Sequence, residues 1–130
     1  MFKAVTGYGK RLKEKREIGM KWMNRLYVGV KAAEQRDKII DCICQGQIQL
    51  DTYVLMLATN DENQLDILSA NYLLQPYYRG QEDLTIVGIA KGKDEAFLVL
   101  QVIVEEAMKA LGTPDIRRFL EMRMQEEIDA

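Results

Sequence analysis

The chain of 130 residues contains no histidine, and this absence argues against several kinds of function at once. Histidine is the usual general base, the commonest ligand of transition metals and the side chain that titrates near neutral pH. A nucleophilic cysteine would therefore lack its imidazole base, and no pair of acidic residues stands out as a catalytic pair. We predict a protein that is not an enzyme and that uses no cofactor and no metal.

Cysteine and long apolar runs are also scarce. Cys42 and Cys44 are the only cysteines, and their spacing favours neither a framework disulfide nor a zinc site. We expect two small buried thiols in a reducing compartment. The first residues lack the apolar stretch of a signal peptide, and no run reaches the ~18 apolar residues of a membrane span. These absences predict a soluble, cytoplasmic protein with no membrane partner.

The charge is unevenly distributed along the chain, although the net charge is only −2. Residues 1–38 contain eleven Lys or Arg and four Asp or Glu, a balance of +7. Residues 39–130 contain seven basic and sixteen acidic residues, a balance of −9. The total excludes a histone-like polycation, while the distribution favours a charged partner or pairing between two copies of the chain.

The basic part divides into a flexible arm at 1–10, where glycines flank an aromatic residue, and a helical segment at 11–45. In this segment apolar residues recur at steps of three and four, which is typical of one long or kinked helix. The alternative is a short strand at 26–30 followed by a helix at 32–45. We favour the long helix because Lys, Arg and Glu dominate the segment and an interior glycine costs only ~1 kcal/mol.

A short apolar segment predicts a strand at 52–58 that is buried on both faces, and a second segment, rich in β-branched residues, predicts a strand at 84–90. Capping residues between them predict a helix at about 62–74. This order and length are typical of a βαβ unit, in which the two strands are parallel. We therefore predict a helix-rich mixed α/β fold with a small, two- or three-stranded, mostly parallel sheet.

The C-terminal part predicts two helices, at 94–111 and from Thr113 to about 127, and Gly112 ends the first of them. The first helix is apolar nearly all round over 96–104, so a narrow sheet cannot cover it alone. We predict one domain over 1–130. Its parts are the arm at 1–10, the basic helical segment at 11–45, a βαβα unit at 46–112 and a C-terminal helix at 113–130.

One candidate site lies where the two predicted strands end. Asn60 follows the first strand, and Lys91, Gly92 and Lys93 follow the second. Ligands bind at the carboxyl ends of strands in open parallel sheets, and backbone N–H groups before a helix attract anions. These residues are candidates for binding a small anion or a nucleotide, although Asp94 replaces the Ser or Thr of a P-loop. The alternative is a solvated turn that caps the helix.

A second candidate is a surface for nucleic acid or a protein partner in the basic segment, 10–38. Basic side chains bind phosphates and aromatic rings stack on bases. The alternative is a charged helix whose Trp, Met and Leu side chains pack onto the domain. The candidate surface consists of Lys10, Arg11, Lys13, Lys15, Arg16, Lys21, Trp22 and Arg25.

A third candidate is an interaction loop formed by Tyr72, Tyr77, Tyr78 and Arg79, because Tyr and Arg are enriched at binding hot spots. The alternative is that these rings pack on the edge of the sheet. Our leading hypothesis is a small non-catalytic interaction or accessory protein that self-associates as a homo-oligomer or binds a protein partner. Nucleic-acid binding and small-anion or nucleotide binding are the alternatives.

Overall fold

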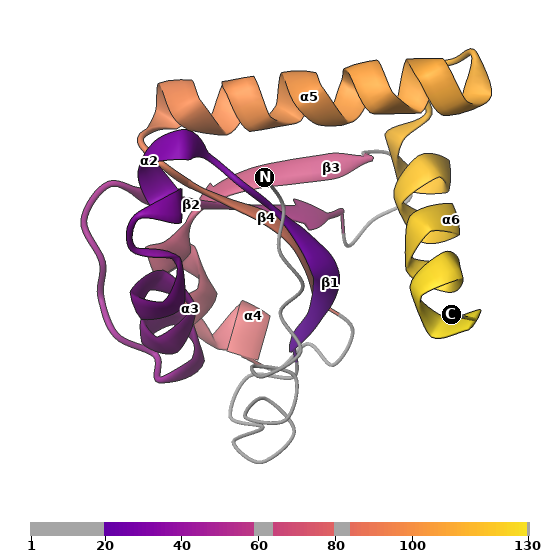
Figure 1. Ribbon diagram of the computed structural model, residues 1–130. Coiled ribbons are helices and arrows are strands. Elements are labelled where there is room, and N and C mark those ends of the chain that lie inside the picture. The colour runs from indigo at the N-terminus through magenta and orange to yellow at the C-terminus, as the bar shows by residue number, and fades with distance from the viewer. Residues whose placement is uncertain (1–19, 59–63, 80–83, 130) are drawn as a thin grey trace.

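The computed structural model describes residues 20–58, 64–79 and 84–129, and a four-stranded mixed sheet lies at its centre (Figure 1). Our predicted arm at 1–10 lies outside these residues. The elements in chain order are β1 (Met20–Val28), α2 (Val30–Ala33), α3 (Arg36–Cys44), β2 (Thr52–Leu57), β3 (Leu65–Ser69), the 3₁₀ helix η1 (Ala70–Leu74), α4 (Pro76–Arg79), β4 (Leu84–Lys91), α5 (Lys93–Leu111) and α6 (Ile116–Asp129).

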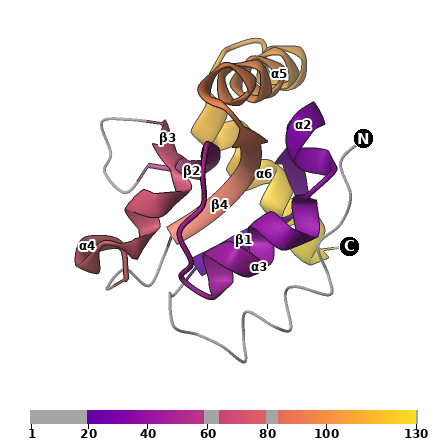
Figure 2. The ribbon, with the colours of Figure 1, turned by 90° about the vertical axis from the view of Figure 1, so that its left-hand side faces the viewer.

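The strands lie in the order β1-β4-β2-β3. β1 is parallel to β4, whereas β2 is antiparallel to both of its neighbours. Successive side chains of β2 enter two different apolar clusters, since Val54 and Met56 pack with α3 while Leu55 packs with α5 and α6. The sheet is therefore buried on both faces, and Figure 2 shows its strands between α5 and α3.

The predicted small, mostly parallel sheet is wrong, although strands at 52–58 and 84–90 were correctly expected. The two strands are antiparallel to each other. Where a helix at about 62–74 was expected, the described residues form the edge strand β3 followed by the short 3₁₀ helix η1. Leu65 and Leu68 have the three-residue spacing of a helix, but on β3 they pack into opposite clusters. Hydrogen bonding to β2 outweighs this local helical pattern.

The predicted long helix at 11–45 is also wrong where β1 occupies residues 20–28. The alternative of a strand followed by helices is closer, although β1 begins earlier than 26 and the helical part is split between α2 and α3. α3 carries both cysteines as free thiols, with Cys44 buried and Cys42 partly exposed.

A bulge explains why β1 resembles a helix in sequence. Trp22 pairs with Ile86 and Tyr27 pairs with Gly88, so β1 advances five residues while β4 advances two. Within the bulge, Met23 faces the cluster with α5 and α6, and Leu26 faces the cluster with α3. A bulged strand can thus place buried residues three apart, as a helix does.

The C-terminal helix closes over the bulge of β1. The N–H groups of Asn24 and Arg25 donate to the two carboxylate oxygens of Glu127, at 3.2 and 3.1 Å. The hydroxyl of Tyr27 donates to Glu106 of α5 at 2.5 Å. Burial, reinforced by this hydrogen bond, raises the pKa of Tyr27 well above its usual value. Polar contacts thus join both C-terminal helices to the first strand.

α6 starts later than the helix that the sequence predicted from Thr113. The helix begins at Ile116, and Asp115 accepts a hydrogen bond from the N–H of Arg118 at 3.2 Å. The hydroxyl of Thr113 accepts from the N–H of Asp115 at 3.1 Å instead. The helix therefore starts later than the sequence suggested, because the side chain of Asp115 caps its first turn.

We expect Glu127→Ala to lower the free energy of unfolding by about 1 kcal/mol, because two N–H groups of β1 lose their acceptor. Glu126→Ala is the matched control, since this side chain is 70% exposed and its contact with Arg123 is long, at 4.0 Å. Its effect should stay within about 0.5 kcal/mol. Urea denaturation measures both, and equal effects would contradict a specific role for Glu127.

Candidate functional site

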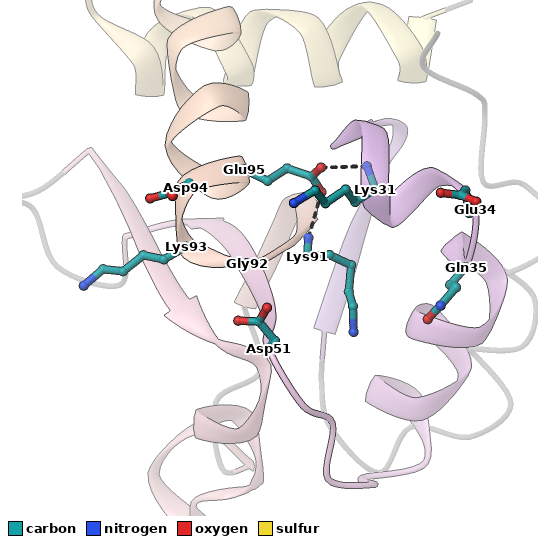
Figure 3. A pocket seen from close by; sticks show the side chains of 9 residues that line it. All are labelled: Lys31, Glu34, Gln35, Asp51, Lys91, Gly92, Lys93, Asp94 and Glu95. Carbon is teal, nitrogen blue, oxygen red and sulfur yellow. Dashed lines mark hydrogen bonds between the residues drawn. The ribbon is translucent and has the colours of Figure 1, made fainter.

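The parallel ends of β1 and β4 meet where α2 and α5 begin, and one buried carboxylate joins them. Glu95, in the first turn of α5, is only 7% exposed. It accepts hydrogen bonds from the N–H groups of Lys31 at 2.6 Å and Lys91 at 2.8 Å (Figure 3). It also accepts one from the N–H of Ala32 at 3.1 Å. A charged acceptor of this kind satisfies the free N–H groups of a helix start.

Gly29 makes room for this carboxylate. A Cβ atom at this position would overlap the side chain of Glu95. The backbone of Gly29 is extended, with φ −64° and ψ 158°, so its conformation alone would admit any residue. Space, not backbone freedom, is what requires glycine at this position.

A hollow of about 590 Å³ opens beside Glu95. Its lining includes three lysines and four acidic residues, so it has no excess of positive charge. The lining residues are Lys31, Glu34, Gln35, Asp51, Lys91, Gly92, Lys93, Asp94 and Glu95.

The anion-binding groups that we predicted here already have partners within the chain. The N–H of Lys91 donates to Glu95, and that of Gly92 donates to the carbonyl of Asp51 at 2.7 Å. The ammonium of Lys91 contacts the carbonyl of Leu50 at 2.9 Å. Lys93 points away from Lys91 in Figure 3. These contacts do not favour an external anion at this position.

The anion site nonetheless stays a prediction, because its fourth candidate, Asn60, lies outside the described residues. A metal site has no support within 20–58, 64–79 and 84–129, where no cluster of three or more metal-ligating side chains occurs. The best-formed polar arrangement at this edge of the sheet is therefore the hydrogen bonding of Glu95 itself.

The predicted basic surface is only partly described. Lys21, Trp22 and Arg25 lie on β1, not on a helix; the two basic side chains are exposed, and Trp22 packs against the cluster with α3. The indole N–H of Trp22 is buried without a hydrogen-bond partner. The nucleic-acid surface stays a prediction. Its other residues, Lys10, Arg11, Lys13, Lys15 and Arg16, lie outside the described part of the chain.

The predicted interaction loop separates into exposed and packed rings. Tyr72 on η1 and Tyr77 on α4 are about half exposed, whereas Tyr78 packs against the cluster with α3. The rings of Tyr77 and Tyr78 meet edge to face, with centroids 4.9 Å apart. Burial, with a smaller effect of Asp66, raises the pKa of Tyr78. The side chain of Arg79 lies outside the described part.

The candidate site that we did not name from the sequence is the outward face of α5. Ala96, Val99, Ile103 and Ala107 are buried on its inner face. On the outer face, four large apolar side chains are each between 37% and 61% exposed. They are Phe97, Leu98, Val102 and Met108. In Figure 1 no described element lies on the side of α5 away from the sheet.

The sequence signal for this face was the nearly all-apolar stretch 96–104, from which we expected cover on more than one side. The sheet and α6 cover one side only. No helix of the described residues is long and apolar enough to cross a membrane.

No family model, curated protein or solved structure matches this chain.

We expect Glu95→Ala to lower the free energy of unfolding by about 3 kcal/mol, because three backbone N–H groups lose a charged acceptor. Asp94→Ala is the matched control, since this neighbouring acidic residue is exposed. It should cost at most about 1 kcal/mol through the helix dipole. Chemical denaturation measures both, and similar losses would show that Glu95 has no special role.

Gly29→Ala should cost about 1 to 3 kcal/mol, because its methyl group meets the carboxylate of Glu95. In a Glu95→Ala background the same change should be neutral or slightly stabilising, since the space is then free and alanine restricts the unfolded chain. A double-mutant cycle measures this coupling. Additive losses would contradict the steric role of Gly29.

Proposed function

We propose that this chain is a small non-catalytic interaction protein that self-associates through the outward face of α5. The observation that carries the proposal is the exposure of Phe97, Leu98, Val102 and Met108 on one side of a single helix. Removal of apolar surface from water favours association. A face of this kind is typical of a surface that a partner covers.

The pattern along α5 supports a specific surface rather than scattered apolar residues. Leu98 and Val102 are four residues apart, so they lie one turn apart on the same side of the helix. Other exposed apolar side chains lie outside such a helix face, for example Ile48 and Leu50 between α3 and β2. α5 is also the longest helix of the described residues, and it offers a rigid surface.

A non-catalytic role is supported by the chemistry that is available. The chain has no histidine, and the polar groups beside Glu95 are used in hydrogen bonds within the protein. The raised pKa of Tyr27 follows from burial and from a structural hydrogen bond to Glu106. None of these groups is arranged as a nucleophile beside a base.

We expect sedimentation equilibrium to show concentration-dependent dimerisation in the micromolar range. Leu98→Glu should raise the dissociation constant at least about tenfold, because an unpaired charge would be buried at the contact. Ile128→Glu, on α6, is the control, since this side chain is 75% exposed and lies on another helix. A strict monomer at 100 μM, or equal effects of both substitutions, would overturn the proposal.

A further inference from the structure

We infer that the occupant of the α5 face is a second copy of α5, packed antiparallel about a two-fold axis that is level with Ile103 but lies on the opposite, exposed side of the helix. This inference rests on the proposed self-association and adds its orientation and register. The order of apolar, acidic and basic side chains along the outward side of α5 supports this arrangement.

The outward face of α5 follows from the helical repeat of 3.6 residues per turn. Asp94, Leu98, Gln101, Glu105 and Met108 succeed one another at steps of three and four, and all of them are exposed. Phe97 lies on one flank of this line and Val102 on the other. The centre of the face is therefore mixed, with two apolar and three polar side chains.

An antiparallel pair with its two-fold axis level with Ile103 brings complementary side chains of this line opposite each other. Leu98 then faces Met108 of the second copy, and Gln101 faces Glu105 of the second copy. Val102 meets its own counterpart close to the axis. Apolar side chains thus oppose apolar ones. The amide of Gln101 donates to Glu105 of its own helix at 3.3 Å, and its second N–H is directed by the pairing toward Glu105 of the other copy.

Other arrangements bring Glu105 to unfavourable positions. In a parallel pair it faces its own counterpart, so two carboxylates meet. If the antiparallel pair is shifted by three residues, Glu105 faces Leu98 of the second copy. If it is shifted by four residues in the other direction, Glu105 faces Glu105 of the second copy. Like charges that face each other weaken association, and so does a carboxylate that faces an apolar side chain.

The ends of the face are complementary in charge. Asp94 lies near the start of α5 and Lys109 near its end, and both side chains are exposed. The antiparallel arrangement brings Lys109 of each copy within about one helical turn of Asp94 of the other. Two symmetric attractions of this kind favour this orientation over the parallel one.

Substitution of Gln101 tests the orientation directly. Gln101→Glu should raise the dissociation constant about 2- to 30-fold, because a second carboxylate then faces Glu105 in two symmetric contacts. Gln101→Lys should lower it by a similar factor at low salt. In a parallel pair Gln101 faces itself, so both substitutions would weaken association. That result, measured by sedimentation, would overturn the inference.

Cross-linking tests the register. In a background carrying Cys42→Ser and Cys44→Ala, checked for folding by circular dichroism, a short bis-maleimide should join Val102→Cys to itself. Leu98→Cys and Met108→Cys should each react poorly alone, yet form a mixed product when combined. Efficient self-linking at all three positions would indicate a parallel pair and overturn the inference.

The two proposals fail in different ways. If Leu98→Glu weakens the dimer but the cross-links or the Gln101 variants disagree, the antiparallel pair is wrong and self-association through α5 stands. If the protein is a strict monomer, both proposals fail.

Discussion

The hydrogen bonds of Glu95 hold together the part of the fold on which the rest of the structure depends. One carboxylate binds the start of α2 and the end of β4, across up to 64 residues of sequence. It thereby supports the adjacent parallel pair β1 and β4, whose ends meet at this point. Gly29 has no side chain because the carboxylate needs that space.

This arrangement also occupies polar groups at the edge of the sheet. An internal carboxylate occupies the backbone N–H groups that could otherwise hold an anion, and the nearby hollow mixes lysines with acidic residues. The exposed apolar side chains of α5 lie instead on the side of this helix that faces away from the sheet.

The local sequence pattern predicted those elements whose buried residues follow the spacing typical of their own secondary structure. The strands β2 and β4 and the helix α5 were expected within a few residues of their observed bounds. β1 was expected only in part, as the less favoured strand at 26–30, because a bulge spaces its buried residues three apart. β3 was missed, because it takes its structure from pairing with β2. Glu95 was missed as well, since its partners are backbone groups that no residue type reveals.

The sequence by itself determined the absence of imidazole chemistry, the uneven charge and the apolar character of α5, because these depend only on residue type and spacing. Only the tertiary structure decided the direction of the strands, the partners of Glu95 and which side of α5 stays exposed. These properties arise from contacts between distant segments, such as Lys31 with Glu95 or Tyr27 with Glu106. Such contacts form through packing and backbone hydrogen bonds, which leave no local pattern in the chain.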